Sequence, residues 1–188
     1  RPLIMFNGDF NNFGINFFAE NKSINTSEFY FTPVGESFSV AGKDKKSLTM
    51  RLAYDATRYI DFIYSLNGNT HLLDFDIKTV GLENIINKNT SYFDLNWKAS
   101  LLKLEKSISN ERQYSTVYYK YTQDDEIDYI NPAKDEEQKL TTQVKWVSFK
   151  QHFFSSILIA KTAFDDGIVN KSTDLASNDV SQANANLT

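Results

Sequence analysis

Two histidines are the first residues of this 188-residue sequence whose side chains suit acid–base chemistry. His152 lies in a phenylalanine-rich stretch, and a histidine paired with a glutamate could act as the general acid of a sugar epimerase. No glutamate is visibly paired with it in the sequence, so a hydrogen-bonded histidine within a sheet is the simpler interpretation. His71 follows the turn-like residues 67–70, where an exposed polar residue is expected.

Carboxylates are the other groups whose spacing suggests chemistry. Asp74 and Asp76 share one face of an expected strand, and this spacing would let two carboxylates share a metal ion or a proton. Lys78 continues the same face, so a solvated face with alternating charges explains all three residues more simply. The acidic cluster at residues 124–128 lacks the glycine and the ligand spacing of a calcium loop. We therefore predict no metal site and no cofactor.

The sequence contains none of the common enzyme motifs. It has no Gly-Lys-Ser/Thr phosphate loop, no Gly-x-Ser-x-Gly elbow and no His-Glu-x-x-His pair. The absence of cysteine excludes a thiol nucleophile, a thiolate metal site and disulfides. A net charge of -4 with scattered lysine and arginine disfavours nucleic acid as a partner, because such binding needs a basic surface. We predict that the chain is not an enzyme.

Alternating apolar and polar residues recur in short segments and predict half-buried β-strands. The segments lie at residues 29–32, 48–54, 60–66, 73–79, 93–98 and 117–121. The clearest hairpin turns at Asn67-Gly68-Asn69, since Asn-Gly tolerates the positive φ of tight antiparallel turns. Residues 101–109 lack a sustained apolar stripe, and we predict strand and loop there. Strands at regular spacing with turns between them indicate an all-β sandwich.

The longest β-prone segment, Val144–Ala160, is rich in aromatic residues and contains neither glycine nor proline. At a period of two, one face carries Lys145, Val147, Phe149, Gln151 and Phe153, and the other carries Val144, Trp146, Ser148, Lys150 and His152. Beyond Phe154 the run is almost wholly apolar. We predict a buried strand that enters the core.

Part of this segment reads Trp-Val-Ser-Phe-Lys-Gln-His-Phe-Phe-Ser-Ser, from Trp146 to Ser156. It closely resembles the signature strand in the periplasmic domain of the bacterial membrane protein insertase family YidC. Further segments in the same order resemble the form of this domain found in Bacteroidetes: Phe17–Asn21, Glu28–Pro33, Arg58–Ile60, Lys78–Leu82 and Tyr118–Tyr121. The resemblance extends from residue 1 to about residue 165.

The resemblance implies a fold and a location. The fold would be an antiparallel two-sheet supersandwich like that of galactose mutarotase, forming a single domain over residues 1–188. The location would be the periplasm, as the soluble domain of an inner-membrane protein. No apolar run reaches the roughly 18 residues of a spanning helix, so we expect a fragment of a longer protein. Its sandwich is then either truncated or closed by residues 166–188, which we predict to be a polar tail or loop.

The resemblance also implies a function. In the family the membrane helices perform insertion, so this fragment would insert nothing alone. The periplasmic domain would support insertion and folding of inner-membrane proteins, like a chaperone, by contacting accessory subunits of the Sec translocon or an extended polypeptide. Nascent membrane proteins would be reached through the full-length protein.

The expected interaction region is the signature strand, at Trp146, Phe149, Gln151, His152, Phe153 and Phe154. Two alternatives stay open. One is a carbohydrate-binding or mutarotase-like epimerase module on the same sandwich fold. The other is a scaffold that only spaces the membrane helices.

Overall fold

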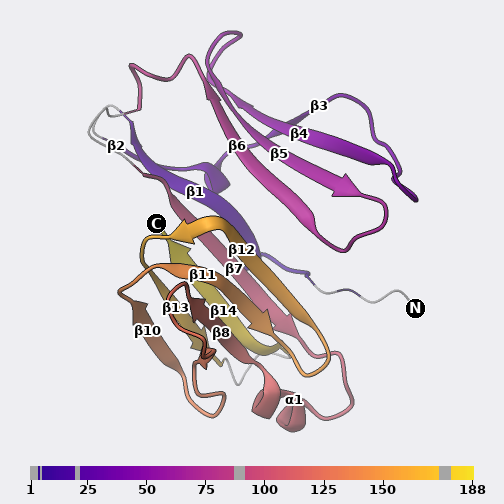
Figure 1. The fold of residues 1–188 in the computed structure, drawn as a ribbon, viewed down its shortest axis with the longest axis vertical. Coiled ribbons are helices and arrows are strands. Elements are labelled where there is room, and N and C mark those ends of the chain that lie inside the picture. Colours follow the sequence, from indigo (N-terminus) through magenta and orange to yellow (C-terminus); the bar gives the residue numbers. More distant parts are fainter. Residues whose placement is uncertain (1–3, 5, 20–21, 87–91, 174–178) are drawn as a thin grey trace. The chain divides into compact units, whose positions relative to one another are not determined.

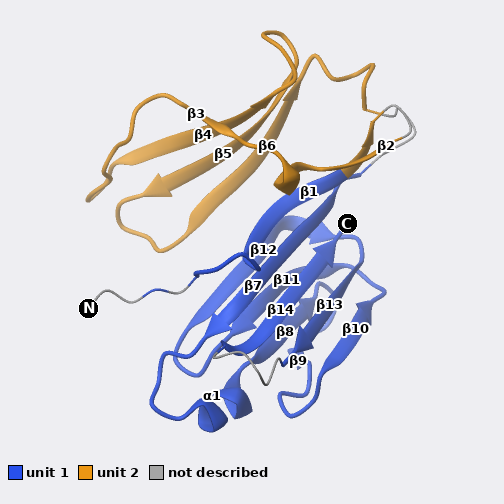
Figure 2. Cartoon of the chain, turned by 180° about the vertical axis from the view of Figure 1, so that it is seen from behind, with its two compact units in different colours: residues 1–16, 92–188 blue, residues 17–91 orange. Residues whose placement is uncertain are grey.

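The computed structural model describes residues 4, 6–19, 22–86, 92–173 and 179–188. They form two compact units (Figures 1 and 2): unit 1 comprises Arg1–Asn16 and Tyr92–Thr188, and unit 2 comprises Phe17–Ser91. The strand pairings within both units are antiparallel. These pairings confirm the all-β antiparallel class. A single domain over residues 1–188 stays a prediction.

The described residues of unit 1 form two sheets and one short helix, α1 (Ile108–Tyr114). In the first, the large sheet, strands follow the order β10-β13-β14-β7-β1. Their bounds are β1 Asn12–Ala19, β7 Asp94–Leu102, β10 Glu136–Leu140, β13 Gly167–Ser172 and β14 Asp179–Leu187. Of β1, residues 12–16 belong to unit 1. The second, the small sheet, has the order β12-β11-β8-β9. Its bounds are β8 Thr116–Tyr121, β9 Asp128–Tyr129, β11 Val144–Lys150 and β12 Ser155–Phe164.

Apolar residues at alternate strand positions form the core of unit 1. The cluster consists of Ala99, Leu101, Val117, Tyr119, Ile130, Leu140, Val144, Val147, Phe149, Val169, Val180, Ala183, Ala185 and Leu187. Trp97 of β7 stacks on Phe149 of β11 with 3.8 Å between ring centroids, so a large aromatic contact joins the two sheets. This arrangement confirms the two-sheet sandwich.

The prediction of a polar tail or loop over residues 166–188 is wrong. β13 and β14 occupy residues 167–172 and 179–187 of this segment, and residues 174–178 lie outside the described residues. β14 lies inside the large sheet between β13 and β7. Ala183 and Ala185 of β14 are fully buried, whereas Asn184 and Asn186 alternate with them on the opposite face. The amides make the segment polar on average and hide the period of two. These strands therefore help to close the sandwich.

The segment Val144–Ala160 is a hairpin, which corrects the prediction of one continuous strand. β11 and β12 pair with each other, and the N–H of Gln151 donates to the carbonyl of Phe154 at 2.7 Å. The chain therefore reverses at His152 and Phe153 without glycine or proline. The prediction that this segment enters the core is confirmed, since Val147 and Phe149 are buried.

The prediction of strand and loop over residues 101–109 holds for residues 101–107 and is wrong for residues 108 and 109, which begin a helix. β7 ends at Leu102, and α1 begins at Ile108 after the N-cap Ser107. The Ser107 hydroxyl accepts a hydrogen bond from the N–H of Asn110 at 3.3 Å, which satisfies one free donor of the first turn. A helix of seven residues is too short to show an apolar stripe.

Unit 2 is built on a four-stranded sheet with the order β3-β4-β5-β6. The bounds are β3 Thr32–Val34, β4 Lys45–Ala53, β5 Tyr59–Asn67 and β6 Leu73–Val80, preceded by β2 Lys22–Asn25 and the 3-10 helix η1 Thr26–Glu28. Register places Met50, Phe62 and Ile77 side by side on one apolar face. On the other face Arg51 donates two hydrogen bonds of 2.8 Å to the Asp61 carboxylate. One face is therefore apolar and the other is polar.

The hairpin predicted at Asn67-Gly68-Asn69 is confirmed, because β5 and β6 pair from Leu66 and Leu73 onward. The role of Gly68 differs from the one expected. It is absent from the glycines with positive φ, and a Cβ at this position would lie 2.5 Å from the carbonyl carbon of Ala41. Glycine is needed here because another loop approaches closely, not because of the turn angle.

Tyr119 of β8 should give the protein an alkaline transition. Burial, with smaller effects of Tyr121 and Asp128, raises its pKa from 10.0 to about 12. The folded state thus disfavours the phenolate. The free energy of unfolding therefore keeps its full value below pH 10 and decreases as the pH rises from 10 to about 12. We expect the urea midpoint to decrease across this window, and to decrease less in Tyr119→Phe. An equal decrease in that variant, with Tyr118→Phe as control, would assign the transition to other groups.

Candidate functional site

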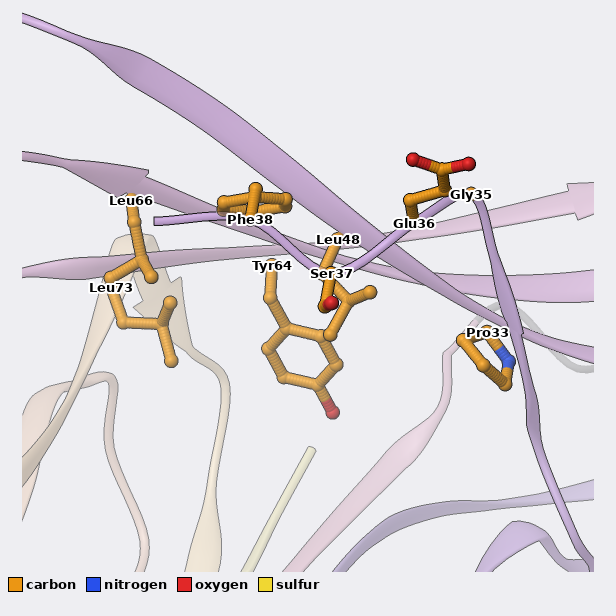
Figure 3. A pocket seen from close by; sticks show the side chains of 9 residues that line it. All are labelled: Pro33, Gly35, Glu36, Ser37, Phe38, Leu48, Tyr64, Leu66 and Leu73. Atoms are coloured by element: carbon orange, nitrogen blue, oxygen red, sulfur yellow. The ribbon is translucent and has the colours of Figure 1, made fainter. Parts of the chain in front are cut away.

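An apolar groove of about 580 Å³ lies over one face of the sheet in unit 2 (Figure 3). The sheet contributes Leu48 from β4, Tyr64 and Leu66 from β5, and Leu73 from β6. These side chains share a face because Leu48 pairs with Tyr64 and Leu66 pairs with Leu73 in the antiparallel register. Pro33 of β3 and residues 35–38, which follow this strand, form the rest of the wall.

The lining of the groove is mainly apolar. Burial raises the pKa of Tyr64, so its hydroxyl is neutral and able to donate or accept a hydrogen bond. The other ionisable side chain of the lining is Glu36, which is exposed. Leu66 and Leu73 are also exposed. Such a surface suits apolar side chains of a ligand with few directional contacts.

A histidine and a glutamate that the sequence did not connect lie together in unit 1. Nδ1 of His152 lies 2.8 Å from Oε1 of Glu105, and the imidazole stacks on Tyr114 and on Phe153, with centroid distances of 4.4 and 4.1 Å. The pair joins the β11–β12 turn to the loop that follows β7. The bond engages Nδ1 of the imidazole and one carboxylate oxygen, and neither residue lines the groove of unit 2. The pair therefore gives no support to an epimerase, because that chemistry needs both groups to converge on a sugar. The pair could not be predicted from the sequence, because Glu105 and His152 are 47 positions apart.

The six residues predicted as an interaction region are divided between core and surface. Phe149 and Gln151 are buried, Trp146, His152 and Phe154 are half-buried, and Phe153 is 71% exposed. Gln151 Nε2 donates to the carbonyl of Leu102 at 2.8 Å, so this side chain holds the hairpin against the end of β7. A part of the signature therefore has a structural role. Its role in interaction stays a prediction.

The remaining sequence candidates lie on solvated surfaces. His71 is exposed and precedes β6, as predicted. Asp74 Oδ2 lies 3.8 Å from Lys45 Nζ, and the residues at 124–126 are exposed in the connection after β8. Among the described residues no group of three or more histidine, cysteine, aspartate or glutamate side chains is placed to hold a metal ion.

Sequence reasoning missed two buried charged residues of unit 1. Glu111 of α1 is 2% exposed, and its Oε1 accepts hydrogen bonds from the N–H groups of Leu104 and Glu105 at 2.9 and 3.0 Å. Lys171 of β13 donates to the carbonyl of Lys134 at 3.3 Å, and burial lowers its pKa. Both side chains bond to loop backbone. No sequence motif marks this kind of contact.

Comparison with known proteins assigns the family. The family model of the YidC periplasmic domain matches residues 6–187. The chain belongs to the YidC periplasmic domain family. The resemblance of the signature strand and of the Bacteroidetes-like segments is thereby confirmed, although Glu20 and Asn21 of one segment lie outside the described residues.

Three relatives show how much of a YidC protein the chain covers. A membrane protein insertase YidC of Bacteroides fragilis is 35% identical over 165 residues, which are 88% of this chain and 25% of the relative. That of Parabacteroides distasonis is 31% identical over 166 residues, with 88% and 25% covered. That of Porphyromonas gingivalis is 30% identical over 181 residues, with 95% and 28% covered. The chain spans about a quarter of the length of these curated relatives.

Two further observations concern the fold of this YidC periplasmic domain and its helices. No solved structure matches the chain, so the likeness to galactose mutarotase stays a prediction. None of the helices in the described residues has the length and apolar character needed to cross a membrane.

Proposed function

We propose that this chain is a non-catalytic module of a YidC insertase that works in the periplasm of a bacterium. There it holds extended polypeptide segments during insertion and folding of inner-membrane proteins, and it contacts accessory subunits of the Sec translocon. Family membership supports the link to insertion, because the relatives are named membrane protein insertases. The nascent membrane protein would be met by the full-length insertase, of which this chain is one part.

The apolar groove of unit 2 is the observation that carries the proposal. A segment destined for a membrane is rich in apolar side chains, and the transfer of these side chains out of water is favourable. Leu48, Leu66 and Leu73 offer such side chains an apolar surface, and the neutral hydroxyl of Tyr64 can bond to a backbone group of the ligand. The side chains are supplied by three paired strands, so the surface is held rigidly.

The absence of a reactive arrangement at the groove supports a non-catalytic role. Its lining contains no histidine, lysine or aspartate. The His152–Glu105 pair belongs to unit 1, and its two groups bond to each other. A sugar epimerase would require such groups in the pocket that receives the sugar.

Site-specific photo-cross-linking in the full-length insertase tests the proposal. A benzophenone amino acid replaces Leu73, which lines the groove, or Tyr30, which is 98% exposed in the same unit and lies outside the groove. We expect adducts with nascent membrane proteins or with a Sec subunit from position 73, in clear excess over position 30. No adduct, or equal yields from both positions, would overturn the proposal.

A further inference from the structure

We propose that the edge strand β12 of unit 1 accepts an extended polypeptide as an additional antiparallel strand, along residues Ser155–Ile159. This inference rests on the proposed function for its class of partner and adds where and how that partner binds. β12 ends the small sheet, whose order is β12-β11-β8-β9, and its paired neighbour is β11 (Figure 1). Its other side carries backbone groups that no strand of the described residues pairs.

Hydrogen-bond alternation identifies these open backbone groups. The bond from the Gln151 N–H to the Phe154 carbonyl makes these two residues a hydrogen-bonded pair at the hairpin turn. In an antiparallel ladder such pairs alternate with pairs whose N–H and C=O groups point outward. Counting along the register, Ser156 and Leu158 bond to β11. The N–H and C=O groups of Ser155, Ile157 and Ile159 therefore point away from the sheet. We call residues 155–159 the open segment.

The same residues present exposed apolar side chains. Ile157 and Ile159 are 54% and 51% exposed, because they lie on the face of β12 opposite Leu158, which is partly buried and packs against the core. Trp146 lies directly across from Ile159 on β11, and its side chain is half-buried. A partner strand would thus gain hydrogen bonds along the edge and apolar contacts at every second residue.

Residues 160–164 of β12 are protected against pairing with another strand. The proposed binding site is therefore limited to residues 155–159. The register shifts so that Ile159 lies opposite Trp146 while Phe164 lies opposite Val144, which makes residues 160–163 a bulge. Lys145 Nζ donates to the carbonyls of Ala160, Lys161 and Thr162 at 3.1, 3.3 and 3.3 Å. Bulges and lysines are common devices that block edge pairing. Residues 155–159 contain no charge, proline or glycine, so they lack these devices.

Edge chemistry and flanking charge determine the partner. Only an extended polypeptide offers donors and acceptors that repeat every second residue and match this edge. A lysine lies beside the open segment: Lys150 is opposite Ser155, and its Nζ donates to the carbonyl of Gln151 at 3.1 Å. The partner is therefore a segment with alternating apolar residues and an acidic residue at the end that meets Lys150.

A peptide that meets these requirements provides the test with the 188-residue chain. The probe is the acetylated peptide Asp-Thr-Val-Thr-Val-Thr-Asp. Binding is followed by the change in intrinsic tryptophan fluorescence, to which Trp146 beside the edge and Trp97 in the core both contribute. N-methylation of the valines removes the donors that face β12 and should abolish binding, whereas N-methylation of the central threonine removes a donor on the far edge and should leave binding unchanged.

Variants of the edge complete the test. Ile157→Lys places a charge on the open segment and should weaken binding by at least about tenfold, a loss of about 1.4 kcal/mol. Ile157→Thr keeps a β-branched side chain, should retain the fold, and should weaken binding less. Ile168→Lys, on the outer face of β13, is the matched control and should bind as the unaltered chain does.

Several results would overturn the inference. These are equal binding by Ile157→Lys and Ile168→Lys, equal loss with both methylated peptides, and an absence of binding by the unaltered chain. Dimerisation of the chain that Ile157→Lys abolishes would assign the edge to a second copy instead. Failure here leaves the proposed function standing if cross-linking at Leu73 succeeds, because that position belongs to unit 2.

Discussion

Phe149→Ala should lower the free energy of unfolding by about 3–5 kcal/mol. The ring is 1% exposed and stacks on Trp97 at 3.8 Å, so its removal leaves a cavity between the two sheets of unit 1. The rigid strands on both sides limit how far the core can collapse into the space. Urea denaturation followed by tryptophan fluorescence measures the loss.

The signature strand itself supplies the control for this experiment. Phe153→Ala removes the same side chain from a position that is 71% exposed, and it should change stability by less than about 1 kcal/mol. Similar losses in the two variants would contradict the assignment of Phe149 to the core and of Phe153 to the surface.

Glu111→Ala should destabilise unit 1 by about 3 kcal/mol, because two N–H donors of the loop after β7 lose their acceptor. The carboxylate is buried, and its Oε1 accepts from Leu104 and Glu105 at 2.9 and 3.0 Å. Glu105 in turn pairs with His152 at the hairpin turn. The substitution should therefore raise the hydrogen-exchange rates of both amides and loosen the β11–β12 turn.

Glu111→Gln distinguishes the hydrogen bonds from the charge. The amide oxygen of glutamine can accept the same two bonds, so this variant should keep most of the stability and the slow exchange at Leu104 and Glu105. Unchanged exchange in Glu111→Ala would show that the carboxylate does not hold the loop.

Strands with a local period of two could be predicted from the sequence. The apolar residues of β4, β5 and β6 alternate with polar ones, and each alternation depends on neighbours within the same segment. The hairpin between β5 and β6 was predicted from the turn signal Asn67-Gly68-Asn69 between two such segments. The sandwich class followed from the repetition of such segments, and the signature strand gave the family.

Features that depend on distant residues could not be predicted. The β11–β12 turn has no glycine or proline, and it is held by Glu105 and Tyr114, which are far away in the sequence. β14 was missed because alanine and asparagine alternate in it. A small apolar residue such as alanine indicates a core position only once the neighbouring strands β13 and β7 are known. The groove and the open edge of β12 likewise follow from the pairing of strands. Neither can be read from any single segment.

Photo-cross-linking in cells that synthesise the full-length insertase tests most directly whether this domain acts by binding polypeptide. We expect adducts with nascent membrane proteins or a Sec subunit from Leu73, and with extended polypeptide from Ile157. We expect far weaker adducts from the exposed controls Tyr30 and Ile168. Equal labelling of all four positions, or no labelling from Leu73 and Ile157, would contradict binding of polypeptide by this domain.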